Sequence, residues 1–144
     1  MRVLFIILIG FITLFGNSEE LENEIYENII TNLFPKKRVK VWTDNSKISY
    51  VFGKYSKKLV VVDKKNADIY ILSHKEDIPN NKIVLTTNYK LLKEIKNSIG
   101  AFYWKKGRPN IVFIEDRLKR KHILLPSKYN DFIESERCLY ELCF

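Results

Sequence analysis

Two short apolar runs separated by a polar loop, within residues 67–88, constrain the fold more than any other part of the sequence. Residues 69–72 and 83–85 are continuously apolar and rich in β-branched side chains, as strands buried on both faces are. The loop between them contains Pro79 and turn-forming asparagines, which exclude a continuous helix. The pattern therefore predicts two central strands of a parallel sheet.

The remaining elements follow from hydrophobic spacing and turn residues. Helices are predicted over residues 18–34, 47–55, 89–97 and 115–121, and from Ser127 onward. Further strands are predicted over residues 39–43 and 59–62, and a hairpin over 99–104 and 110–114 with its turn at 105–109. This order predicts an α/β fold, a three-layer sandwich with a mainly parallel sheet, flanking helices and a late antiparallel β-hairpin. The strand order cannot be derived from the pattern.

The first 18 residues have the composition of a cleaved secretory signal peptide. Arg2 supplies the positive start, residues 3–15 are almost unbroken apolar, and residues 16–18 form a small-x-small cleavage site. An apolar run of about 13 residues is short for a membrane span, which needs roughly 20. We expect export to the periplasm and a single α/β domain over residues 19–144, with an uncleaved membrane anchor as the alternative.

The charge of the chain favours anionic partners. The net charge is +8, and removal of Arg2 with the signal segment leaves 24 basic against 17 acidic side chains, or +7. A basic exported domain is suited to anionic lipid, an acidic protein surface or a small anionic ligand. The competing interpretation is an ordinary solvated surface, because most of the charges are lysine pairs at the ends of elements.

Cys138 and Cys143 are the only cysteines and lie five residues apart in the last seven residues of the chain. If residues 135–144 are helical, the two side chains point apart and a local disulfide is strained. If this tail is frayed, the cysteines can close a small loop or pair between molecules in an oxidising compartment. Their spacing is not that of a redox CxxC motif or a zinc site.

The sequence contains no GxGxxG, GxxxxGK[ST], HExxH or GxSxG motif, so we expect no enzyme, no cofactor and no metal site. His74 follows a central strand, and a hydrogen-bonding loop residue is the simpler interpretation of it. His122 lies among like charges, which disfavour both its protonation and cation binding. Catalysis that depends on Ser73 or His74 is the remaining enzymatic alternative.

Polar residues follow the predicted strands at the edge where open parallel sheets bind ligands. Hydroxyl groups and helix N-terminal amides suit carboxylate or phosphate recognition. Junctions between strands and helices use the same residue types without any ligand, so the pattern has both interpretations. The residues of this candidate ligand site are Thr43, Asp44, Asn45, Ser46, Ser73, Thr86, Thr87 and Asn88.

The predicted hairpin carries a basic and aromatic cluster. Aromatic side chains among cations can stack on nucleic-acid bases, but export argues against a nucleic-acid ligand. Aromatic residues in a hairpin also fill a core, and tyrosine, tryptophan and arginine are the residues on which protein interfaces depend most. The candidate partner-binding residues are Tyr103, Trp104, Lys105 and Arg108.

The order of these features resembles the YfiR-type (YfiR/HmsC-like) family of bacterial periplasmic regulators. The matching stretches are residues 24–34, 67–73, 83–87, 98–102, 107–113 and 124–129. The resemblance implies a non-enzymatic regulator that binds and restrains an inner-membrane diguanylate cyclase or sensor kinase. A small periplasmic solute- or anion-binding protein is the alternative, and a homodimer is compatible with either.

The chain also departs from that family's pattern. It has no cysteine before Cys138, whereas family members often carry internal disulfides, so redox control through such bridges is in doubt. Glu115 and Asp116 follow the last predicted strand near the position where the family has an asparagine. The chain is also shorter than usual for the family.

Overall fold

The structure is a computed structural model that describes residues 18–141 and 143. The predicted signal segment lies outside the described residues, except for Ser18. Within the described ranges, no helix combines the length and the apolar character needed to cross a membrane. The elements are α2 Ser18–Leu33, β1 Val39–Thr43, α3 Ser46–Tyr55, β2 Leu59–Val61, β3 Ile69–Leu72, β4 Ile83–Thr86, α4 Leu91–Glu94, β5 Ser98–Lys105, β6 Arg108–Ile114, α5 Glu115–Arg120, η1 Ser127–Phe132, β7 Ile133–Glu134 and η2 Glu136–Leu139.

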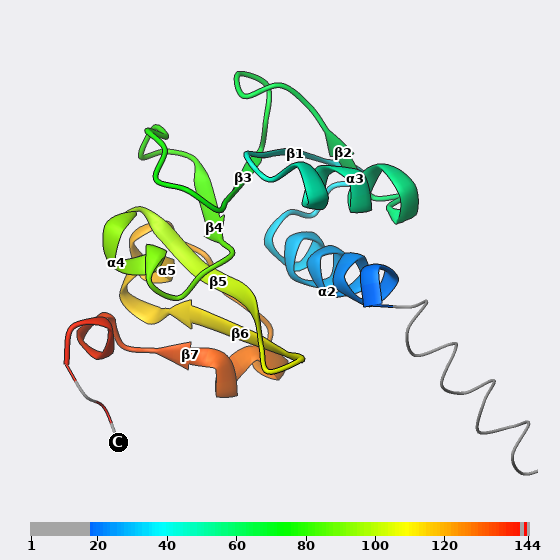
Figure 1. Ribbon diagram of the computed structural model, residues 1–144. Coiled ribbons are helices and arrows are strands. Elements are labelled where there is room, and N and C mark those ends of the chain that lie inside the picture. The colour runs from blue at the N-terminus through cyan, green and yellow to red at the C-terminus, as the bar shows by residue number, and fades with distance from the viewer. Residues whose placement is uncertain (1–17, 142, 144) are drawn as a thin grey trace, which may run out of the picture.

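The strands form one seven-stranded sheet in the order β2-β1-β3-β4-β5-β6-β7. The first five of these strands run parallel, β6 is antiparallel to β5, and β7 is parallel to β6. Figure 1 shows β2 and β7 at opposite ends of this sheet. The predicted α/β fold, with a mainly parallel sheet and a late antiparallel pair, is confirmed.

Helices α2 and α3 cover one face of the sheet (Figure 1). Tyr26 of α2 lies at the centre of the contact, with its ring 5.3 Å from that of Phe52 in α3 and 4.8 Å from that of Phe102 in β5. Both ring pairs are nearly perpendicular, the geometry in which the positive edge of one ring meets the negative face of the other. These contacts join the two helices to the sheet.

The opposite face of the sheet is covered by loops and short helices. Ala67 and Ile78, from the loops on either side of β3, are buried there with Tyr70 and Leu72. Further along, Leu92 of α4 and Leu139 of η2 pack on the apolar side chains of β5 and β6. This third layer is thin, because the connections around β3 contain no helix.

The predicted helix over residues 89–97 is wrong in length, because only Leu91–Glu94 is α-helical. The Ile95 carbonyl accepts hydrogen bonds from the Ser98 hydroxyl at 2.6 Å and from Arg117 Nη1 at 3.2 Å. Ser98 is already the first residue of β5, so the chain leaves the helix to enter the sheet. Tertiary contacts therefore end this helix early.

The helix predicted from Ser127 onward is instead the 3-10 helix η1, followed by strand β7. Pro126 precedes η1, and the Pro126 carbonyl accepts from the Tyr129 amide at 3.0 Å. The Tyr129 ring packs on Phe113 with 5.6 Å between centroids. Ile133 pairs with Phe113, so the chain must be extended there and an α-helix cannot continue.

Candidate functional site

The β5–β6 hairpin ends in a tight turn that projects beyond the sheet (Figure 1). The predicted five-residue turn over 105–109 is wrong, because Lys105 pairs with Arg108 and only Lys106 and Gly107 lie between the strands. Both turn residues have positive φ angles, 52° and 75°. Positive φ at both central positions is the type I′ arrangement, whose twist matches that of the strands, so the turn is well defined.

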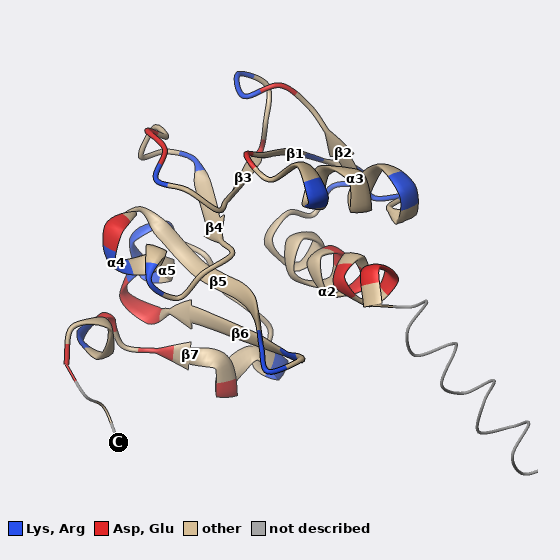
Figure 2. Ribbon diagram, in the orientation of Figure 1, with Lys and Arg blue, Asp and Glu red and all other residues tan. Residues whose placement is uncertain are grey.

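The hairpin tip, residues 104–109, is exposed along its whole length. It carries the cations Lys105, Lys106 and Arg108 and no acidic residue, and Figure 2 shows it as a blue end of the hairpin. Trp104 is 40% exposed and rests with one side on Phe102, at 5.8 Å between ring centroids. The tip therefore combines three positive charges with a partly uncovered indole ring.

The predicted partner-binding residues divide over the two faces of the hairpin. Tyr103 and Lys105 alternate with Trp104 along β5, so Trp104 points to the face that α2 covers. Lys105 pairs directly with Arg108, which places these two side chains on the same face as Tyr103. The structure therefore brings Tyr103, Lys105 and Arg108 to one face and leaves Trp104 on the other.

Tyr103 is only partly exposed because it packs beside Tyr89, with 6.3 Å between the ring centroids. The Tyr89 hydroxyl donates to Glu134 Oε2 at 3.0 Å. Burial, together with this hydrogen bond and the charge of Glu134, raises the pKa of Tyr89 to about 12. Burial and the same carboxylate also raise the pKa of Tyr103, so both phenols stay protonated at neutral pH.

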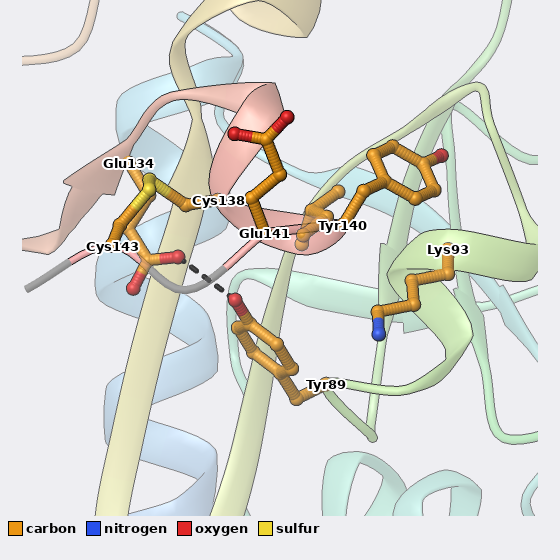
Figure 3. Close-up of a pocket in the computed structure, with 8 residues that line it drawn as sticks. Tyr89, Lys93, Glu134, Cys138, Tyr140, Glu141 and Cys143 are labelled. Atoms are coloured by element: carbon orange, nitrogen blue, oxygen red, sulfur yellow. Dashed lines mark hydrogen bonds between the residues drawn. A yellow bond between two sulfur atoms is a disulfide. The ribbon is translucent and has the colours of Figure 1, made fainter.

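A cavity of about 460 Å³ opens next to this tyrosine pair (Figure 3). Figure 3 shows the Tyr89 hydroxyl directed at Glu134, with the Cys138–Cys143 disulfide above it. The two cysteine Cα atoms lie 5.3 Å apart, within the range that a disulfide spans. The cavity is lined by Tyr89, Lys93, Glu134, Cys138, Leu139, Tyr140, Glu141 and Cys143.

The other predicted site lies at the carboxyl ends of β1, β3 and β4, where Asp44 and Ser73 form the centre of a hydrogen-bond network. The Asp44 carboxylate accepts from the Ser73 amide at 2.7 Å and from the His74 amide at 2.9 Å. Ser73 Oγ lies 2.8 Å from Thr87 Oγ1 and accepts from Asn45 Nδ2 at 3.0 Å. The polar groups of this network therefore hydrogen-bond to one another, and these bonds join the ends of three strands.

The remaining residues of that predicted site hold the local backbone. Thr43 Oγ1 accepts from the Asn45 amide at 3.1 Å, and Asn88 Oδ1 accepts from the Lys90 amide at 2.8 Å. Thr86 is buried and donates to the Asn88 carbonyl at 2.9 Å. Ser46 is the exposed first residue of α3. All eight residues therefore lie at the predicted edge, mainly as turn and capping groups.

The two histidines lie apart from any cluster of metal-ligating side chains. His74 is exposed, and its Nδ1 lies 3.1 Å from Asp44 Oδ2. His122 is exposed and has a positive φ of 56°, in the turn after α5. Among the described residues, no group of three or more histidine, cysteine, aspartate or glutamate side chains is arranged to hold a metal ion.

Sequence reasoning missed Tyr89 and Glu134, which lie 45 positions apart in the chain. They meet because β7 pairs with β6 and brings Glu134 opposite Ile114. A two-residue strand has no periodicity of its own, so only the apolar character of Ile133 hinted at it. No model of a known protein family matches this chain, and no curated protein matches it either.

Proposed function

We propose that this protein is a non-enzymatic, exported regulator that binds and restrains the periplasmic domain of an inner-membrane signalling protein, a diguanylate cyclase or a sensor kinase. The observation that carries the proposal is the exposed hairpin tip, which presents the ring of Trp104 on one face and the cations Lys105 and Arg108 on the other. The resemblance of the sequence to the YfiR-type regulators supplies the class of partner.

The tip has the properties of an interface anchor. Tryptophan and arginine contribute most to binding where they are fully buried by a partner, and Trp104 is 40% exposed in the free protein. A two-residue turn holds these side chains in place before binding, which reduces the entropy lost on association. Because the tip is cationic, we expect an acidic partner surface, which accelerates encounter.

The disulfide between Cys138 and Cys143 supports the exported location. Disulfides persist in the periplasm and other oxidising compartments and are rare in the reducing cytosol. The basic net charge of +8 for the whole chain is compatible with an acidic partner in that compartment.

A small-solute-binding function is the second candidate. The observation that favours it is the strand order. Strand β2 is added on one side of β1, whereas β3 and the later strands are added on the other side, so the order of the strands switches between β1 and β3. Ligands of open parallel sheets bind outside the carboxyl ends of the strands at such a switch point. Asn45 and Ser73 lie at this point.

The first test is in-cell photocrosslinking in the native host. A photoreactive residue replaces Lys106 at the hairpin turn, and a matched one replaces Lys65, an exposed lysine in the loop between β2 and β3. We expect the residue at 106 to capture a membrane protein with a cyclase or kinase domain and the residue at 65 not to do so. Capture of a transport permease would favour the solute-binding candidate, and equal capture from both positions would contradict a hairpin interface.

The captured partner then allows an affinity measurement. We expect Trp104→Ala to weaken binding by about 30- to 1000-fold, the loss of roughly 2–4 kcal/mol that interface anchors show. Lys105→Glu introduces repulsion against an acidic partner and is compared with Lys65→Glu, which makes the same charge change away from the hairpin. An equal effect of the two lysine variants would show a general charge effect and would count against the proposed interface.

A further inference from the structure

A second cavity, of about 390 Å³, lies at the opposite edge of the sheet from the Asp44 network. It opens at the amino ends of β4 and β5, where Asn80 precedes one strand and Asn97 precedes the other. Its volume is many times the roughly 30 Å³ that one water molecule occupies in the liquid. The lining residues are Asn80, Lys96, Asn97, Arg117, Arg120, Lys121 and Glu136.

The lining is strongly cationic. Its lysine and arginine side chains are balanced by a single carboxylate, that of Glu136. Glu136 Oε1 accepts from Arg117 Nε at 3.0 Å, and Arg120 Nη2 donates to both oxygens of the same carboxylate at 3.2 and 3.1 Å. Lys96 has no hydrogen-bond or ion-pair partner among the described residues. The cavity therefore carries a clear excess of positive charge.

Arg117 contributes a buried donor that the protein itself leaves unpaired. The side chain is 1% exposed, and its Nη1 donates to the Ser98 carbonyl at 3.0 Å and to the Ile95 carbonyl at 3.2 Å. Its Nη2 is buried and has no hydrogen-bond partner among the described residues. A buried charged donor without an acceptor is unfavourable, and Arg117 is also one of the residues that line the cavity.

Lys121 is a partly buried cation of the same lining. Its amine donates to the backbone carbonyls of Asn80, at 2.9 Å, and of Lys82. Burial lowers the pKa of Lys121, and the positive charge of Arg120 lowers it further. An anion in the cavity would offset this repulsion.

We propose that this cavity binds a phosphate group, held by the guanidinium group of Arg120 and the ammonium group of Lys96, beside the buried charge of Arg117. Guanidinium groups bind phosphate through paired, charge-assisted hydrogen bonds, and a doubly charged tetrahedral anion neutralises several cations better than one carboxylate does. The ligand chemistry is shared by inorganic phosphate and phosphate monoesters. The site is independent of the hairpin tip.

The test uses the purified protein expressed from the whole chain, titrated with sodium phosphate and, in a second arm, with methyl phosphate. Sodium chloride at equal ionic strength is the reference. We expect a rise in Tm of about 5 °C when the ligand is tenfold above its Kd, with a further logarithmic rise at higher ligand concentration. In ¹H–¹⁵N spectra we expect the Arg117 side-chain resonances to shift with the same Kd. A response to both ligands indicates a site that accepts monoesters, and a response to phosphate alone indicates the free ion.

The variant Lys96→Gln/Arg120→Gln removes two exposed charges and leaves the buried Arg117 in place, so that its unchanged spectrum reports a folded protein. We expect this variant to lose at least tenfold in phosphate affinity. The control is Lys119→Gln, because Lys119 lies on the same helix, is paired with Glu115 and does not line the cavity. An equal loss in the control would overturn the proposal. Absence of a phosphate response in the unmodified protein would also overturn it.

Discussion

A side chain at Gly100 would have no room between β5 and β6. A Cβ atom built at Gly100 would overlap the Val112 carbonyl oxygen and lie 2.8 Å from Phe113 Cδ1. Contacts under 3.0 Å with a carbonyl oxygen can be relieved only by moving the backbone. Gly53, in α3, presents the opposite case, because nothing lies within 4 Å of the Cβ atom that alanine would add.

We predict that Gly100→Ala lowers the free energy of unfolding by about 1–3 kcal/mol, the usual cost of overpacking. Gly53→Ala is the control, and we expect it to raise the free energy of unfolding by roughly 0.5–1 kcal/mol through the reduced entropy of the unfolded chain. Urea unfolding monitored by circular dichroism measures both. A neutral effect of Gly100→Ala would contradict the close approach of the two strands.

The sequence predicted where polar residues follow the strands but not what their side chains contact. His74 was interpreted as a hydrogen-bonding loop residue after a central strand, and its Nδ1 lies 3.1 Å from Asp44 Oδ2. Tyr103 was predicted to contact a partner, and it is partly exposed while its ring packs beside that of Tyr89. The direction of a side chain depends on neighbours from distant parts of the chain, which a local pattern does not contain.

Among the elements, α3 is held at its start by Asn45. Its Oδ1 accepts from the amides of Lys47 and Ile48, at 3.0 and 3.2 Å, while its Nδ2 reaches Ser73 Oγ at 3.0 Å. One side chain therefore caps the helix and ties it to the end of β3.

We predict that Asn45→Ala lowers the free energy of unfolding by about 1–2 kcal/mol, because both the cap and the link are lost. Asn45→Ser restores the capping oxygen but is too short to reach Ser73, so it should recover about half of that loss. The midpoints of urea unfolding compare the two variants. Equal losses in both would show that the link to β3, rather than the cap, stabilises the helix.

Helices and strands with a clear hydrophobic periodicity were predicted well. Elements whose limits depend on contacts with distant segments of the chain were not. Helix α2 and strand β1 lie within one residue of their predicted limits. Helix α4 is short because Arg117 and Ser98 capture the Ile95 carbonyl. Strand β7 forms because the backbone at Ile133 pairs with the free edge of β6.

For the molecule as a whole, acid should be destabilising because several carboxylates hold distant segments together. Burial acts to raise the pKa of Glu136, but the hydrogen bonds from Arg117 and Arg120 outweigh it and lower the pKa. The same balance lowers the pKa of Asp68, beside Lys36 and Lys40, and that of Glu27. Burial raises the pKa of Glu22, which has the opposite effect on stability.

Where the folded pKa of a carboxyl group is below its unfolded value, the unfolded chain takes up the proton first as the pH falls. We therefore predict that the free energy of unfolding declines from about pH 5 downward. Glu136→Gln should be less stable than the unmodified protein at pH 7 and show a shallower decline in acid. Glu115→Gln is the control, because Glu115 forms only an exposed pair with Lys119. Urea unfolding at several pH values measures the free energy of unfolding of each variant. Parallel pH curves for the unmodified protein and Glu136→Gln would contradict a stabilising role of the Glu136 carboxylate.

Local sequence patterns were sufficient to predict the α/β class, the central strands β3 and β4, the first helix and strand, and the sheet edge at which polar residues gather. These features follow from local hydrophobic spacing and from residues that stop helices, so a short stretch contains all the information they need. Contacts between distant segments set the strand order, the two-residue turn at Lys106 and Gly107, and the hydrogen bond between Tyr89 and Glu134. The same holds for the cationic cavity around Arg117, because it joins residues from four separate segments of the chain. Such contacts depend on which segments pack together, and that is settled by the burial of the whole core rather than by any one stretch of sequence.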